Sequence, residues 1–314
     1  MNDNTRFLNN RRTDLALEER ESFEEDDVEI KGVVLEEEYD EEQNIKITRV
    51  EIKDERGAEA MRKPIGTYIT IEAPDIAGAD EGYHEPVSKL VAKYIEELAR
   101  GVEGKHVLVA GLGNRSLTAD ALGPQVVDNL FVTRHLVREF GTEFAKRNKM
   151  ESMSAISPGV MGQTGMESSE ILRGIIEETK PDILVVIDAL AARSVSRLNT
   201  TIQITDTGIS PGAGVGNNRN ALNEESLGVQ VIALGVPTVV DAATIVQDRM
   251  EEALRKRGFS EQEVYQFLSE MTDQDVSNMF VTPKNIDDSI KRISYTISEG
   301  INSVFYKAPT AAQS

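Results

Sequence analysis

Two short apolar segments, each followed by an aspartate, constrain the fold of this 314-residue chain more than any other feature. The first covers residues 105–110 and precedes Asp120, while the second covers residues 182–187 and leads directly into Asp188. Short continuous apolar runs are typical of parallel strands that helices cover on both faces. Ligands of such sheets bind at the carboxyl ends of the strands. We therefore expect Asp120 and Asp188 to converge around one water molecule or one metal ion.

Strand and helix signals alternate around this pair of aspartates. Strands that alternate with helices of this length predict an α/β fold, here a three-layer α/β/α arrangement with a mostly parallel sheet. The predicted strands are 105–111, 152–157, 182–188, 200–205 and 229–234, and the predicted helices are 123–140, 167–179, 238–257, 260–271 and 285–301.

The first eighty residues have a different pattern. Residues 28–35 and 45–52 approximate an apolar and polar alternation with acidic residues between them, which predicts an antiparallel hairpin. Residues 67–71 predict another strand, and residues 86–100 predict a helix that ends at a glycine. Residues 1–14 lack apolar periodicity and are interpreted as a loose extension. The chain thus divides into 1–14, an acidic β-rich subregion at 15–80, and an α/β/α core at 81–314.

Composition narrows the chemistry and the partners. The chain has no cysteine, which excludes disulfides, thiolate nucleophiles and cysteine-ligated zinc. The net charge of −20 argues against a surface for nucleic acid or an anionic membrane. The absence of a run of eighteen apolar residues and of a basic-then-apolar start argues against a membrane span or a secretory signal. A cytoplasmic location is the expectation.

Glycine-containing loops lie beside the predicted strand ends. Gly111-Leu112-Gly113 follows a strand, but Ser116 occupies the third glycine position of a dinucleotide fingerprint, so we interpret these glycines as a tight turn near a site. The loop 157–165 opens a helix and offers N–H groups that could hold a carboxylate or an oxyanion. A plain connection is the alternative for that loop. The loop 210–218 could form a lid over the substrate.

The three histidines do not support a histidine-based mechanism. His84, His106 and His135 all lie away from the predicted functional edge of the sheet, and neither a Gly-x-Ser-x-Gly elbow nor a His-Glu-x-x-His motif occurs. Carboxylate chemistry remains. Two nearby carboxylates repel each other, which raises one pKa, so one group can stay protonated while the other activates water. The resulting hypothesis is amide hydrolysis by Asp120 and Asp188.

Several motifs together resemble the germination protease family of spore-forming bacteria, over essentially the whole chain. A more remote similarity, in the Gly-x-Gly-Asn turn and the strand-end Asp-Ala, is to the hydrogenase-maturation proteases, which share an α/β/α fold. The matching segments are Arg12 to Ala16, Gly111 to Asn114, Thr118 with Asp120 to Pro124, Ser157 to Val160 with Gln163 to Gly165, and Asp188 to Ala191 with Arg193-Ser194.

This resemblance implies an endopeptidase that is made as a zymogen and degrades small acid-soluble spore proteins during germination. It implies that Asp120 and Asp188 are catalytic and that the protein is a homotetramer in the forespore or spore core. The family cuts after Glu or Asp, before a large apolar residue followed by Ala. Asp14-Leu15-Ala16 fits that preference, so the resemblance implies that the chain removes residues 1–14 itself.

An acidic residue before the cut requires a local basic pocket in this acidic chain. We assign substrate binding to Arg193 and Arg219, with Asn114 and Gly159 from the glycine-containing loops. A surface salt bridge is the alternative role for either arginine. We expect no cofactor and no metal, because the maturation proteases add a histidine ligand and no histidine follows Asp188.

Two other functions stay open on the sequence. One is a metal-dependent maturation protease of a partner protein, which chelators would inactivate. The other is a noncatalytic protein whose acidic surface binds basic spore proteins, which would form stable complexes and keep an intact N-terminus.

Overall fold

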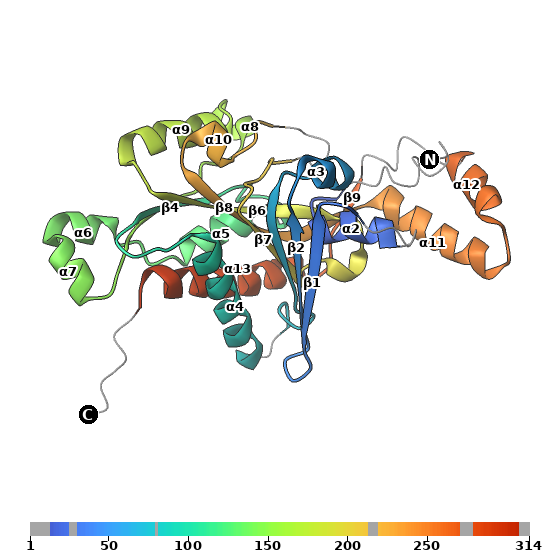
Figure 1. Ribbon diagram of the computed structural model, residues 1–314, viewed down its shortest axis with the longest axis horizontal. Coiled ribbons are helices and arrows are strands. Elements are labelled where there is room, and N and C mark those ends of the chain that lie inside the picture. The colour runs from blue at the N-terminus through green and yellow to red at the C-terminus, as the bar shows by residue number, and fades with distance from the viewer. Residues whose placement is uncertain (1–12, 25–29, 79–80, 213–218, 271–278, 308–314) are drawn as a thin grey trace.

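A computed structural model describes residues 13–24, 30–78, 81–212, 219–270 and 279–307. Within these residues the centre of the molecule is a nine-stranded sheet in the order β1-β2-β3-β7-β8-β6-β4-β5, with β9 paired to β8 (Figure 1). The strands are β1 (Val33–Asp40), β2 (Ile45–Ile52), β3 (Gly66–Glu72), β4 (His106–Gly111), β5 (Ser152–Ile156), β6 (Ile183–Ala192), β7 (Thr201–Thr205), β8 (Gln230–Asp241) and β9 (Phe280–Val281).

Helices cover both faces of this sheet. Figure 1 shows α4 and α13 on one side of the sheet and α9 and α10 on the other. The helices are α2 (Ala16–Glu24), α3 (Glu55–Met61), α4 (His84–Leu98), α5 (Leu122–Asp128), α6 (Arg134–Phe140), α7 (Thr142–Arg147), α8 (Met161–Thr164), α9 (Ser168–Thr179), α10 (Glu224–Leu227), α11 (Ala242–Lys256), α12 (Glu261–Glu270) and α13 (Ile286–Phe305), with short 3-10 turns η1 (Glu81–Tyr83), η2 (Thr118–Asp120) and η3 (Val195–Arg197).

The core follows from the continuous apolar strands. Side chains of β4 and β6 alternate between the two faces, so Val107 and Val109 pack with α4, α5 and α13, whereas Leu108 and Ala110 pack with α9 and α10. Strands of this kind must be covered on both faces. The three-layer α/β/α prediction is therefore confirmed.

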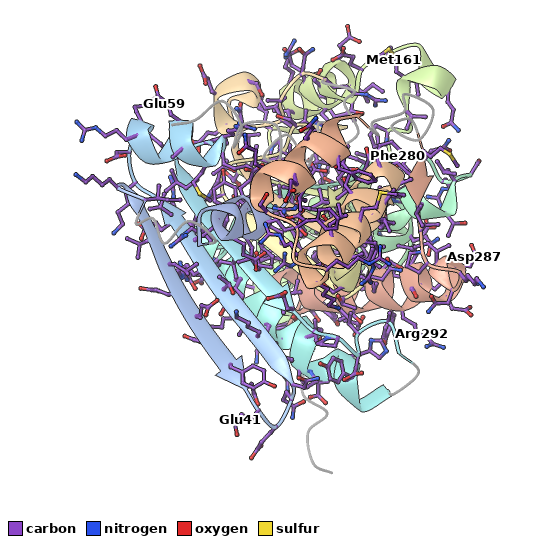
Figure 2. The ribbon with its side chains drawn as sticks, turned by 90° about the vertical axis from the view of Figure 1, so that its right-hand side faces the viewer. Glu41, Glu59, Met161, Phe280, Asp287 and Arg292 are labelled. Atoms are coloured by element: carbon purple, nitrogen blue, oxygen red, sulfur yellow. The ribbon has the colours of Figure 1, made fainter. Side chains whose placement is uncertain are left out.

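Parallel pairing is confined to one end of the sheet, from β8 to β5. β5, β4, β6 and β8 are parallel, while β1, β2, β3 and β7 extend the sheet with antiparallel neighbours. β7 and β9 thus carry the antiparallel part further than the predicted N-terminal subregion. Figure 2 shows these N-terminal strands at the left of the molecule, with Glu41 at the hairpin tip and Glu59 on α3 at the opposite end.

The predicted hairpin is present, but its first strand is shifted. β1 begins at Val33 and includes Glu36 to Glu38, which the sequence pattern assigns to the connection. β1 is an edge strand and most of its side chains are exposed. Edge strands with charged side chains resist pairing with another chain, so acidic residues are well tolerated there.

Two helix predictions were wrong in extent. The predicted helix at 123–140 is divided into α5 and α6, because Thr133 is hydrogen-bonded to Met153 of β5. The N–H of Thr133 donates to the carbonyl of Met153, and the N–H of Met153 donates to the hydroxyl of Thr133. The helix at 238–257 begins only at Ala242, because β8 continues to Asp241 along the equally extended β6. The bulge between Leu190 and Ala191 accommodates this extension.

The N-terminal segment is ordered closer to its start than expected. Residues 1–12 of the predicted extension lie outside the described residues, but Leu15 and Ala16 are completely buried, and α2 begins at Ala16. Among the helices described, none has both the length and the apolar character needed to cross a membrane.

Candidate active site

Asp188 lies inside β6, one residue past the end of the pairing between β6 and β4, and it is paired there with Gly235 of β8. Asp188 is only 6% exposed, and one of its carboxylate oxygens accepts a hydrogen bond of 2.9 Å from the N–H of Ala189. The predicted strand ends at Asp188, whereas β6 continues for four more residues to Ala192. A carboxylate in the middle of a buried strand is costly unless something compensates for its lost hydration.

Asp120 reaches the same region through a tight turn. It ends η2, and its carboxylate accepts a hydrogen bond of 2.8 Å from the N–H of Asn114. Gly113 has φ +109°, and a Cβ atom there would lie 2.0 Å from the carbonyl oxygen of Asp120, so the turn requires glycine. Thr238 of β8 fixes η2 from the other side by donating to the carbonyl of Ala119.

One cavity of about 410 Å³ brings the two aspartates together. Asp120, Asp188 and Asp14 all line it, although they come from three distant parts of the sequence. Phe280 of β9 also lines the cavity, and Figure 2 shows Phe280 on the same side of the molecule as Met161 of α8. The predicted convergence of Asp120 and Asp188 at one cavity is thus present in the structure.

Burial controls the ionisation of both aspartates. Burial raises the pKa of Asp188 well above its ordinary value, and the charges of Asp120 and Asp14 raise it further. Burial also raises the pKa of Asp120, against the hydrogen bond from Asn114 and the positive charge of Arg219. Because Asp188 is the more buried of the two and faces two other carboxylates, we assign it the proton when the pair holds only one.

The four residues assigned to substrate binding have different surroundings. Arg219 and Gly159 line the cavity, and the buried Nε of Arg219 has no hydrogen-bond partner among the described residues. Arg193 does not line the cavity, and its backbone N–H donates to the carboxylate of Glu18. Asn114 holds Asp120 through its backbone, while its side chain accepts a hydrogen bond from Gln163.

The predicted cleavage site is firmly held. The backbone N–H of Asp14 donates to the carbonyl of Ala191, and the N–H of Ala191 donates to the Asp14 carboxylate at 2.9 Å. Leu15 is completely buried and packs in one apolar cluster with Leu190 and Val240. The residue on each side of the predicted cut is therefore anchored to the strands that carry the site.

Three residues around this segment, Glu18, Lys63 and Gln203, were not singled out from the sequence. Glu18 of α2 accepts hydrogen bonds from Thr13 and from the backbone of residues 193 and 194, and Arg197 pairs with Glu18, Glu21 and Glu72. Lys63 and Gln203 both donate to the carbonyl oxygen of Asp14. Gln203 could have been noticed as a lone amide in the strand Thr-Ile-Gln-Ile-Thr, but Lys63 gave no such signal.

The predicted second glycine-rich loop is only partly visible. Pro211 and Gly212 line the cavity, whereas residues 213–218 lie outside the described residues. In the parts of the chain that the structure describes, no group of three or more His, Asp or Glu side chains is arranged to hold a metal ion. The cavity thus offers two carboxylates with raised pKa values and one cation, a set suited to acid and base catalysis.

Comparisons with known proteins place the chain in a peptidase family. The model of that family matches residues 11–264 and describes the germination proteases. The chain belongs to the germination protease family. It is 50% identical to a germination protease from Caldanaerobacter subterraneus, with 93% of each chain covered, and 48% identical to one from Clostridium perfringens, with 93% of this chain and 94% of the relative covered.

A more distant relative and one solved structure complete the comparison. A germination protease from Bacillus cytotoxicus is 39% identical, with 94% of this chain and 93% of the relative covered. The crystal structure of a NiFe hydrogenase maturation protease, HycI from Thermococcus kodakarensis, is 16% identical with a TM-score of 0.32, and the match covers 65% of this chain and 98% of that one. The family assignment confirms the resemblance and supports a peptidase role in spore germination.

Proposed function

We propose that the chain is a self-processing endopeptidase in which Asp120 and Asp188 hydrolyse the bond between Asp14 and Leu15. The observation that carries this proposal is that all three aspartates line one cavity. Membership of the germination protease family supports it. Residues 1–14 act as a propeptide in this account, because Asp14 occupies the cavity that a substrate must enter.

The carboxylate pair supplies both proton transfers. Ionised Asp120 removes a proton from water as the water oxygen bonds to the carbonyl carbon of Asp14, and protonated Asp188 gives its proton to the nitrogen of Leu15 as the C–N bond breaks. The products are a new α-carboxyl group on Asp14 and a new α-amine on Leu15, and the pair again holds one proton, now on Asp120. The raised pKa of Asp188 supports its role as the acid.

The same site in the processed protein would act on small acid-soluble spore proteins in the forespore or spore core. We propose cleavage after Glu or Asp, before a large apolar residue followed by Ala. Arg219 is the better candidate for recognition of the acidic side chain, because it lines the cavity and Arg193 does not. A homotetramer remains part of the proposal, and sedimentation analysis of the purified protein tests it.

Digestion of purified small acid-soluble spore proteins tests the substrate assignment. We expect the processed protein to cut after Glu or Asp, as read by mass spectrometry of the fragments, and Arg219→Ala to weaken that preference. Arg193→Ala serves as the matched control and should retain it. An unchanged preference in Arg219→Ala would remove that residue from the proposal, and stable binding without cleavage would favour the noncatalytic alternative.

A chelator separates the remaining alternative from the carboxylate mechanism. The proposed mechanism predicts equal cleavage of the spore proteins with and without EDTA. Loss of cleavage in EDTA, with recovery on addition of a divalent metal, would instead favour a metal-dependent protease.

The rate of self-processing should have a bell-shaped dependence on pH. Above the raised pKa of Asp188 both carboxylates are ionised and no acid is available, whereas below the pKa of Asp120 both are protonated and no base remains. Processing should therefore be fastest between the two pKa values and slower on either side of them. The measurement is the intact mass over time across a pH series, and a rate that rises steadily towards high pH would contradict this assignment.

A further inference from the structure

The bond between Asp14 and Leu15 lies between two cavities. Asp14 and Leu190 line the cavity of about 410 Å³ that contains the carboxylate pair, and they also line a second cavity of about 190 Å³. Lys63 and Gln203 lie on the wall of this smaller cavity. Two polar donors thus lie beside Asp14 in the smaller cavity, and neither of them lines the cavity of the carboxylate pair.

These donors bind the carbonyl oxygen of the bond that is proposed to break. Nζ of Lys63 donates to the carbonyl oxygen of Asp14 at 2.9 Å, and Nε2 of Gln203 donates to the same oxygen at 3.3 Å. Preorganised donors at a carbonyl oxygen become most valuable when that oxygen gains negative charge in a tetrahedral intermediate. A cationic donor is the strongest of this kind.

The fold holds both side chains in place. α3 ends at Met61 and is capped by Arg62, which has φ +50°. Lys63 follows, and its backbone N–H donates to the carbonyl of Ala58. Gln203 is the central residue of β7, and its Oε1 accepts a hydrogen bond of 2.7 Å from the N–H of Ala16. Gln203 therefore spans the bond, with one contact before it and one contact after it.

The environment of Lys63 favours a role beyond attachment of the segment. Burial lowers the pKa of Lys63, and the negative charges of Asp14 and Glu19 only oppose that effect. A neutral carbonyl oxygen compensates a buried ammonium poorly, but an oxyanion at the same distance compensates it well. The interaction is thus stronger in the transition state than in the ground state, which is the condition for catalysis.

We infer that Lys63 and Gln203 form the oxyanion-binding group for cleavage of the bond between Asp14 and Leu15, an inference that rests on the proposed self-processing. As water adds to the carbonyl carbon, the π electrons move to the oxygen, and both donors stabilise the charge. When the bond to Leu15 breaks, those electrons return to form the carbonyl of the new carboxyl group. Lys63 and Gln203 keep their protons throughout.

Intact-mass time courses of the full-length chain at mildly acidic pH test this inference. We expect Lys63→Met and Gln203→Glu each to slow the loss of residues 1–14 by about 10²–10³-fold, the usual effect of removing one oxyanion donor. Gln203→Glu is informative because it keeps an acceptor for Ala16, removes the amide donor to Asp14 and adds a carboxylate that would repel an oxyanion. Lys63→Arg retains a cationic donor and should recover much of the rate.

Arg62→Met is the matched control, since Arg62 lines the same small cavity and the change removes the same charge. It should process at nearly the wild-type rate, and all variants should melt close to the wild-type temperature. Wild-type rates in both Lys63→Met and Gln203→Glu would overturn the inference, as would an equal loss in Arg62→Met. If the wild type itself keeps residues 1–14, the proposed function fails instead.

Discussion

Replacing Asp188 with asparagine is expected to slow self-processing by at least about 10²–10⁴-fold, the usual contribution of one acid or base group. Asparagine nearly matches the shape of aspartate but cannot deliver a proton to Leu15. Asp120→Asn should cause a similar loss, and the double variant should be little worse than either single one, because the two carboxylates act as a unit.

The Asp188→Asn substitution should also stabilise the fold at neutral pH. Because burial raises the pKa of Asp188 in the folded protein, the folded state holds its proton at pH values where the unfolded chain, with an ordinary pKa of 3.8, has released it. Wild-type stability is therefore lost as pH rises through the raised pKa. The Asp188→Asn variant escapes this loss, so it should melt at a higher temperature at pH 7 but gain nothing below pH 3.8.

Asp182→Asn is a suitable control for both effects. Asp182 precedes the same strand, and its carboxylate is exposed and binds the N–H of His106, far from the cavity. That variant should process normally and should show no rise in melting temperature. A lower melting temperature for Asp188→Asn at pH 7 would contradict the assignment of a destabilised buried carboxylate.

Truncation of Glu18 to alanine should produce the largest loss of stability. The Glu18 side chain is 1% exposed, accepts hydrogen bonds from the backbone N–H groups of Arg193 and Ser194, and pairs with Arg197. Removing one partner of a buried ion pair costs about 3–5 kcal/mol. Because Arg197 keeps its partners Glu21 and Glu72, we expect a loss at the lower end of this range, about 3 kcal/mol of the free energy of unfolding. The measurement is urea unfolding at pH 7.

Glu21→Ala provides the comparison on the same helix and the same arginine. The Glu21 side chain is 40% exposed, so its loss should cost no more than about 1 kcal/mol. Similar losses in the two variants would show that burial of Glu18 does not determine the strength of this network.

The central part of the fold could be predicted because its signals are local. β4 and β6 are continuous apolar runs, and the carboxyl ends of parallel strands define where Asp120 and Asp188 must lie. The helix at 123–140 was wrong because its interruption depends on bonds between Thr133 and a strand twenty residues away, which no local pattern encodes.

The surroundings of the site could be predicted less well, for a related reason. Asp14 was found through its neighbours Leu15 and Ala16, but its contacts with Ala191 connect residues 177 positions apart. Lys63 and Gln203 reach the same carbonyl oxygen from α3 and β7, and neither belongs to a motif. Such contacts depend on tertiary packing and become visible only in the folded chain.

The concentration dependence of self-processing tests the central claim most directly. If Asp14 is cleaved in the cavity that it occupies, the rate constant for loss of residues 1–14 should stay unchanged over a hundredfold dilution, and processed wild type should leave added Asp188→Asn protein intact. A rate that rises in proportion to concentration, or removal of residues 1–14 from Asp188→Asn by the wild type, would contradict cleavage of the bond where the structure holds it.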